Sequence, residues 1–188
     1  MDIRQVLVVI RNVCEKFIPY RGLVCLEHTP DDAIINQLQH QFYFQVSTSN
    51  IEIVILSPFG NYSKHSQNLR ELIKKIKMQS KNDIMLIVED AFFEKKNLLD
   101  TVAEFTVYPF RIFTFAVPEH QSVPPHRILS ETEVEELLRN EHITLKDLPE
   151  ILVSDPPIVW LGGKAGQVVE IIRDSQTTIT SIYYRRIR

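Results

Sequence analysis

Three glycines, Gly162, Gly163 and Gly166, surround a lysine and come nearest in this chain to a phosphate-binding loop. Such loops work because the backbone N–H groups of glycines can approach phosphate oxygens closely. The spacing matches neither the Walker A pattern nor GxGxxG, and no serine or threonine follows Lys164. We therefore expect tight turns that lead into a strand rather than a nucleotide site.

The sequence also lacks a set of residues with the spacing of a zinc site or of a nucleophilic catalytic site. His120, His126 and His142 are irregularly spaced, and the cysteines lie far from them in sequence. Cys14 and Cys25 form no CxxC pair and no framework of secreted type, so we expect them to pack as small hydrophobic residues in a reducing compartment. No Ser-His-Asp or Cys-His arrangement can be assembled, which favours a protein that binds over one that reacts.

The composition is that of an ordinary globular protein. The 188 residues are 44% hydrophobic with a formal net charge of −3, so the chain can bury a core in one domain or two. This charge excludes a generally basic nucleic-acid coat, and any DNA contact must come from a local patch. No apolar run approaches the ~20 residues that span a bilayer, and the N-terminus lacks a signal-peptide layout. We expect a soluble, intracellular protein.

Helices and strands alternate in the first 117 residues, which predicts an α/β arrangement of layers. The expected elements are a helix over 3–17 that ends near Pro19, a helix from an N-cap at Thr29 to His40, strands at Phe42–Val46 and Ile51–Leu56, a helix containing Leu69, Leu72, Ile73 and Ile76, a strand at Ile84–Val88, a helix containing Leu98, Leu99 and Val102, and a strand at Arg111–Val117.

Three prolines within residues 118–126 predict a linker without regular structure. Beyond it we expect a small α+β domain, in which Ser130 and Glu133 form a capping box at the start of a helix. The other expected features are a buried helix face made by Val134, Leu137 and Leu138, a short helix at Thr144–Asp147 that ends before Pro149, and strands at Val168–Ile172 and Ile179–Tyr184.

A series of short motifs runs through this second domain. In order, they are Pro124-Pro125-His126 ahead of Leu129-Ser130, Leu148-Pro149-Glu150-Ile151, Asp155-Pro156, Gly163-Lys164 before a strand from Gly166 to Arg173, Ser175-Gln176-Thr177 and Tyr184-Arg185. Their order and spacing resemble the assembly domain of the fifth subunit of eukaryotic-type DNA-directed RNA polymerases and of its archaeal counterpart. Proteins of this kind keep a large enzyme together and do no chemistry of their own.

The segment Pro157–Gly163 departs from the pattern of cellular members and resembles the version in large nucleocytoplasmic DNA viruses, especially the asfarvirus-like group. A viral origin implies the host cytoplasm, in a viral factory, and the virion. A cellular origin implies the nucleus.

The first half resembles the family's jaw domain more loosely, through Arg21-Gly22 and the strand at Met85–Val88. The resemblance implies a restriction-endonuclease-like, non-catalytic α/β fold. In the family, the loop after this strand carries a Thr-Pro motif near downstream DNA, whereas Phe93–Lys96 stands there in this chain. Lys95 and Lys96 are our candidates for phosphate contacts. On the residues alone, two lysines at the start of a helix are usually part of a solvated surface, and the DNA contact is what the resemblance implies.

Because this fold is related to that of restriction-type nucleases, the enzymatic alternative to consider is a metal-dependent nuclease. It would need acids on two strands and a lysine to hold Mg²⁺ and place a water. Pieces of that set are present as Asp83, Glu89, Asp90, Glu94 and Lys96. We expect no nuclease activity, because Glu94-Lys95-Lys96 falls in a segment between a strand and a helix and no second acid pairs with it.

The sequence thus predicts a jaw domain at 1–117, a linker at 118–126 and an assembly domain at 127–188. We expect a non-catalytic polymerase subunit whose assembly domain docks on the largest subunit, with downstream duplex DNA near the jaw. No cofactor, membrane or small-molecule substrate is expected, and the metals of the whole enzyme would belong to other subunits. The alternative is a free-standing DNA-binding transcription regulator with the same fold. The candidate interface residues are Asp155, Pro156, Pro157, Ile158, Trp160, Leu161, Gly163, Gly166, Arg173, Tyr184 and Arg185. The sequence does not distinguish between two roles for Trp160, an anchor in the interface and a residue of the core.

Overall fold

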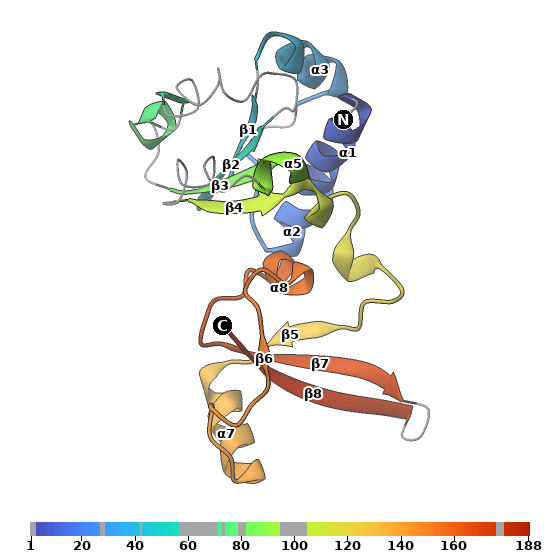
Figure 1. The fold of residues 1–188 in the computed structure, drawn as a ribbon, viewed down its shortest axis with the longest axis vertical. Coiled ribbons are helices and arrows are strands. Elements are labelled where there is room, and N and C mark those ends of the chain that lie inside the picture. Colours follow the sequence, from blue (N-terminus) through green and yellow to red (C-terminus); the bar gives the residue numbers. More distant parts are fainter. Residues whose placement is uncertain are drawn as a thin grey trace. The chain divides into compact units, whose positions relative to one another are not determined.

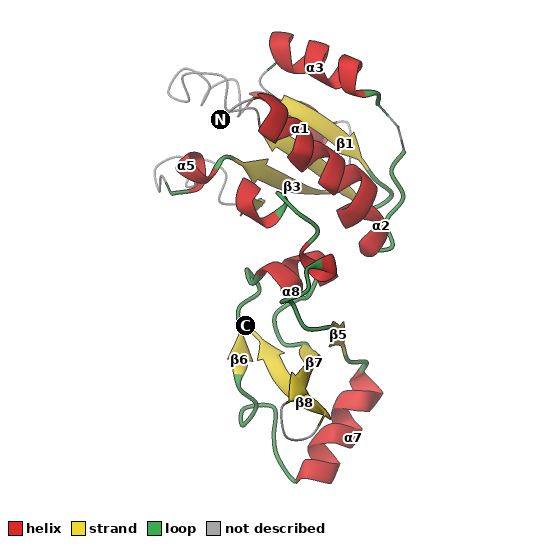
Figure 2. Ribbon diagram, turned by 90° about the vertical axis from the view of Figure 1, so that its right-hand side faces the viewer, coloured by secondary structure: helices red, strands yellow, loops and turns green. Residues whose placement is uncertain are grey.

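The chain divides into two compact units, Met1–Phe115 and Ala116–Arg188. The computed structural model describes residues 3–26, 29–41, 43–56, 71–72, 74–78, 82–94, 105–175 and 179–188 (Figures 1 and 2). Both units combine helices with a mixed four-stranded sheet. The functional domain ranges 1–117, 118–126 and 127–188 stay predictions.

The sheet of the N-terminal unit has the order β1-β2-β3-β4. Its strands are β1 (Tyr43–Ser47), β2 (Ile51–Leu56), β3 (Asp83–Val88) and β4 (Thr106–Pro109). The first pair is an antiparallel hairpin, and the other two pairings are parallel. The central strands β2 and β3 are almost continuous runs of buried apolar residues, as expected for strands covered on both faces. The predicted strands at Ile51–Leu56 and Ile84–Val88 are confirmed, as is the one at Phe42–Val46 apart from Phe42, which lies outside the described residues.

The N-terminal unit begins with three consecutive helical segments. They are α1 (Ile3–Asn12), the π-helical segment η1 (Val13–Phe17) and α2 (Ile18–Tyr20). This confirms the predicted first helix, and Figure 2 shows α1 lying across one face of the sheet. The helix α3 (Asp31–His40) begins one residue later than predicted, because Pro30 is its N-cap instead of Thr29. Pro30 has extended backbone angles, and the two aspartates that follow occupy the first turn.

The other face of this sheet contacts the helical residues 71–72 and 74–78. Leu72 and Ile76 pack there against Val54, Leu86 and Val88. Leu69, Ile73 and the predicted helix at Leu98, Leu99 and Val102 lie outside the described residues.

The predicted strand at Arg111–Val117 is wrong. β4 ends at Pro109, and a 3-10 turn, η3 (Phe110–Ile112), follows it. Phe110 and Phe113 lie three residues apart, a spacing that brings side chains to one side of a 3-10 turn. Both are fully buried, and the Phe113 ring meets the Phe17 ring edge-on at 5.0 Å between centroids.

The C-terminal unit has a second sheet, of order β5-β7-β8-β6. Its elements are η4 (Val117–Glu119), β5 (His126–Ile128), α7 (Glu131–Glu141), β6 (Glu150–Ile151), α8 (Pro156–Leu161), β7 (Val168–Ser175) and β8 (Ile179–Ile187). β7 and β8 form a long antiparallel hairpin, and β6 runs parallel to β8. The two predicted strands are confirmed and are longer than expected.

Two expectations for this unit are wrong. The predicted linker contains the 3-10 turn η4, and its last residue, His126, already pairs with Ile171 in the sheet. Thr144–Asp147 is one turn and not a helix. The Asp147 carboxylate accepts hydrogen bonds from the Thr144 backbone N–H and hydroxyl, at 2.8 and 2.7 Å. Pro149, two residues on, cannot continue a helix.

Candidate subunit interface

The helix α8 lies at the centre of the candidate interface and is at the same time part of the core. Asp155 is its N-cap, prolines form its first turn, and Gly162 ends it with a left-handed φ of 71°. Ile158 packs against Val169, Ile171 and Ile187. Gly163 lies so close to this cluster that an added Cβ would be 2.7 Å from atoms of both Ile158 and Ile187.

The candidate residues therefore separate into three groups by burial. Ile158 is fully buried and Trp160 is 1% exposed, so the structure assigns both to the interior and not to a free surface. Pro156, Gly166 and Arg173 are exposed. The remaining candidates are partly buried, namely Asp155, Pro157, Leu161, Gly163, Tyr184 and Arg185.

Charged groups surround the start of α8. The His126 ring nitrogen Nδ1 lies 2.6 Å from the Pro124 carbonyl oxygen. Burial lowers the pKa of His126, although that hydrogen bond and the nearby Asp155 oppose the shift. Burial also raises the pKa of Asp155, against the opposing charges of His126 and Arg185. Three of the sequence motifs thus converge on one half-buried polar cluster.

The hairpin of β7 and β8 extends beyond its neighbours. β5 pairs only with residues 169–171 and β6 only with 186–187. Among the described residues, no third strand continues the sheet beside 173–175 and 179–184. We call this part the exposed ribbon. It carries Ile182 and Tyr183, which are 53% and 49% exposed, and the Arg173 guanidinium lies over the Tyr183 ring.

The exposed ribbon presents apolar groups on both faces. Side chains alternate along a strand, and Val168 faces α7 whereas Val169 faces α8. Ile182 pairs with Ile172 on the α7 side, and Tyr183 pairs with Ile171 on the α8 side. Sequence analysis missed Ile182 and Tyr183. Their alternation marked a strand, but nothing local showed where the neighbouring strands stop.

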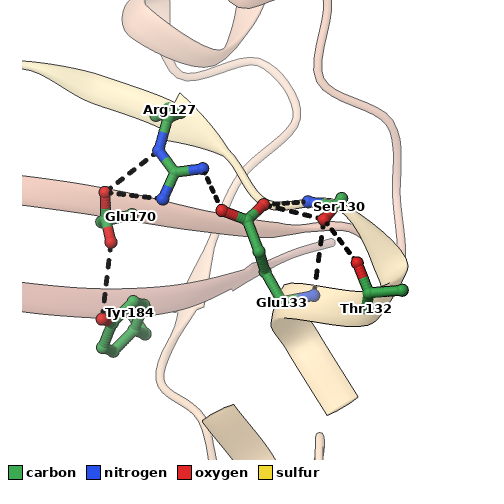
Figure 3. A network of polar contacts seen from close by, with 6 residues as sticks. All are labelled: Arg127, Ser130, Thr132, Glu133, Glu170 and Tyr184. Atoms are coloured by element: carbon green, nitrogen blue, oxygen red, sulfur yellow. Dashed lines mark hydrogen bonds and ion pairs between the residues drawn. The ribbon is translucent and has the colours of Figure 1, made fainter. Parts of the chain in front are cut away.

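A network of polar contacts fixes α7 to the sheet (Figure 3). Ser130 and Glu133 form the predicted capping box, in which the Ser130 N–H donates to Glu133 Oε2 at 2.8 Å. The Arg127 guanidinium bridges Glu133 at 2.6 Å and Glu170 at 3.1 Å, and the Tyr184 hydroxyl donates to Glu170. The network therefore connects the start of α7 with β5, β7 and β8.

Removing the cap should weaken this connection. Ser130→Ala deletes the oxygen that accepts from the Glu133 backbone N–H, and losing such a cap costs about 0.5–2 kcal/mol of stability. We expect a lower urea midpoint, followed by fluorescence of the only tryptophan, Trp160. Ser122→Ala, at another exposed serine of this unit, is the control and should leave the midpoint unchanged.

The same network predicts a pH dependence. Hydrogen bonds from Ser130, and then the Arg127 guanidinium, lower the pKa of Glu133 to about 2. A lowered folded-state pKa stabilises the fold above the ordinary value near 4.5, and this contribution is lost as the pH falls from 4.5 towards 2. In Glu133→Gln, the urea midpoint should depend less on pH over that range than in the wild type. Glu135→Gln, on the same helix, should keep the wild-type dependence on pH. Identical profiles for the two variants would contradict the assignment.

The residues proposed for DNA contact and for nuclease chemistry are only partly described. Lys95 and Lys96 lie outside the described residues. Glu94 is the C-cap of a short helix, α5 (Asp90–Phe93), which follows β3 and was not predicted. The Asp90 carboxylate pairs with Arg111 at 2.6 Å. Within the described ranges, no three His, Cys, Asp or Glu side chains come together as metal ligands.

The helices in the described parts of the chain lack the length and apolar character needed to cross a membrane.

Comparison with known proteins finds relatives that match both units of the chain. The family model described as RNA polymerase Rpb5, C-terminal domain, matches residues 115–187. A DNA-directed RNA polymerase RPB5 homolog of African swine fever virus is 31% identical over 189 residues, covering 92% of each chain. The DNA-directed RNA polymerase subunit Rpo5 of Thermococcus onnurineus is 51% identical over 78 residues, which are 42% of this chain and 89% of the archaeal protein. The corresponding subunit of Thermococcus celer is 49% identical over 73 residues.

Proposed function

Because the chain belongs to the RPB5 family of DNA-directed RNA polymerase subunits, we propose that it is a non-catalytic subunit that docks on the largest polymerase subunit through its C-terminal unit. The archaeal relative carries the main support. A protein named as a polymerase subunit is matched over 89% of its length by only 78 residues of this chain. That length is close to the family match at 115–187, which supports an assignment of the docking function to the C-terminal unit.

The docking surface in this proposal joins the exposed ribbon to the outer side of α8. A two-stranded ribbon without further neighbours is marginally stable in water and gains from a partner. Ile182 and Tyr183 offer apolar area, and fully burying side chains of this kind contributes about 1.5–3 kcal/mol each. Exposed Pro156 and partly buried Arg185 add contacts near the start of α8. Ile158 and Gly163 pack against the core behind α8 and support this surface.

The N-terminal unit, in the same proposal, is the part of the lower jaw that guides downstream duplex DNA. Lys95 and Lys96 follow α5 in the sequence and would neutralise phosphates without reading bases. The viral relatives favour the host cytoplasm and the virion as the place of action, and a cellular enzyme would place it in the nucleus.

The first experiment identifies what co-purifies with the tagged chain from its native or infected cell after a high-salt wash. We expect the two largest polymerase subunits in stoichiometric amounts by mass spectrometry. A variant that ends at Val123 should recover neither. Recovery of the chain alone would overturn the proposal. It would then favour the free-standing DNA-binding regulator, whose affinity for DNA should fall steeply with salt.

A point variant tests the surface itself. Ile182→Lys should reduce recovery of the largest subunit by about tenfold or more, because it puts a charge in the centre of an apolar contact. Leu145→Lys is the matched control, since Leu145 is another exposed apolar residue of the same unit, and it should behave as wild type. Equal recovery for both variants would remove the ribbon from the interface and leave the subunit assignment intact.

A further inference from the structure

A cavity of about 750 Å³ lies in the N-terminal unit, beside α1, η1, α3 and β1. Apolar side chains such as Ile10 and Phe44 form part of its wall, and the ion pair between Arg11 and Asp31 joins α1 to α3 there. Both cysteines of the chain line this one cavity. The fold therefore brings together two thiols that the sequence analysis treated as separate packing residues.

The two thiols are neighbours at this cavity, and charge and a side-chain hydrogen bond from Cys25 are among the causes that raise the pKa of Cys14. Both are reduced and only partly buried. Because they border a cavity, small reagents can reach them. Two partly exposed thiols that line one cavity are suited to a disulfide, which joins cysteines whose Cα atoms come within about 7 Å.

Separate elements hold each sulfur in place. Cys14 lies in the π-helical segment, and π-helical turns are frequent at functional sites. Between them the chain reverses at Gly22, whose φ of 67° favours glycine, and the Leu23 N–H donates to the Ile18 carbonyl at 3.0 Å. Cys25 is then fixed to the end of the hairpin by its β-bridge with Thr48.

We propose that Cys14 and Cys25 are a redox-modification site that closes to an intramolecular disulfide when the protein meets a peroxide. This site lies in the N-terminal unit and does not depend on the proposed docking function. The bond would connect the first helical segment to the edge of the sheet across the cavity wall.

The chemistry balances with hydrogen peroxide as the oxidant. The Cys25 sulfur attacks one peroxide oxygen, the O–O bond breaks, water leaves and Cys25 becomes a sulfenic acid. The Cys14 sulfur then attacks the Cys25 sulfur, the S–S bond forms, and the hydroxyl leaves with the Cys14 proton as a second water. Two thiols lose two electrons, and the peroxide gains two.

The first step is assigned to Cys25 because Cys14 is held as a thiol. Burial, with smaller effects from Cys25 and Glu15, raises the pKa of Cys14 to about 12. The thiolate is the attacking form, so the raised pKa disfavours Cys14 as the first attacker, and in the second step Cys14 gives its proton to the leaving hydroxyl as the S–S bond forms.

The test treats the purified full chain with hydrogen peroxide, blocks the remaining thiols and measures intact mass and a peptide map. We expect a monomer that has lost the mass of two hydrogen atoms, with Cys14 linked to Cys25. Cys14→Ser should stop at a Cys25 sulfenic acid, which dimedone traps, and Cys25→Ser should keep its thiol at low peroxide. Disulfide-linked dimers, or a persistent sulfenic acid in the wild type, would overturn the proposal.

A second measurement shows whether the fold, and not mere closeness in sequence, brings the sulfurs together. In a glutathione redox buffer, the effective concentration of the two thiols should be at least about tenfold higher in the native protein than in urea. An equal or lower value in the native protein would contradict a poised pair. Both measurements use the protein alone, so they do not depend on polymerase binding.

Discussion

Replacing Ile158 with alanine is expected to lower the free energy of unfolding of the C-terminal unit by about 2–5 kcal/mol, the usual cost of truncating a buried isoleucine. Ile158 is fully buried among Val169, Ile171 and Ile187, so the lost methyl groups leave a cavity between α8 and the sheet. Urea unfolding followed by Trp160 fluorescence measures this directly. The only tryptophan of the chain lies in this unit, so its fluorescence reports on the unit that carries the substitution.

The matched control is Leu152→Ala, because Leu152 is 51% exposed and lies just ahead of α8. It should change stability by no more than about 0.5 kcal/mol. If Ile158 served docking alone, both variants would be equally stable and only binding would differ. That outcome would contradict the position of Ile158 in the core.

Gly163→Val is expected to destabilise the same unit by about 1–3 kcal/mol or more, through overpacking. An added Cβ at Gly163 would lie 2.7 Å from Ile158 Cγ2 and from Ile187 Cδ1. Both neighbours are buried and have little room to move. The effect should appear as a lower urea midpoint by Trp160 fluorescence.

Ala165→Val adds the same kind of bulk two residues later, at an exposed position, and should leave the midpoint near the wild-type value. A wild-type midpoint for Gly163→Val would show that the backbone shifts easily and that the glycine serves another purpose. The structure thus gives Gly163, selected from the sequence as an interface residue, a packing reason for its identity.

Elements defined by local chemistry were predictable from the sequence. The capping box of Ser130 and Glu133 involves four consecutive residues, and both its bonds are present. The β1–β2 hairpin and the β7–β8 hairpin follow from alternating or continuous apolar residues between polar turns. The resemblance to the fifth polymerase subunit, and to its viral form, is confirmed by the relatives.

Elements that depend on distant partners were not predictable. β6 is only two residues long and exists through its pairing with the C-terminal strand. No helix was predicted at α8, although proline is well tolerated in the first turn of a helix. The contact between Cys14 and Cys25 required the reversal at Gly22 and the bridge to Thr48, which no local pattern contains.

The interface residues illustrate the same limit. Motif matching selected Asp155, Ile158 and Trp160 together, but it cannot tell a residue that contacts a partner from one that holds the surface in shape. Burial makes that distinction for Ile158 and Trp160. Exposure also places Ile182 and Tyr183 in the proposed docking surface, although no motif singled them out.

A cell that makes this chain in excess of its partners keeps the exposed ribbon in water. Open strand edges with apolar side chains such as Ile182 and Tyr183 favour edge-to-edge association, and the charge of Arg173 is a modest safeguard. If the exposed ribbon is the proposed docking surface, copies made in excess of the larger subunits would keep this edge open to association with one another. The length of β7 and β8 would then favour balanced synthesis of the subunits.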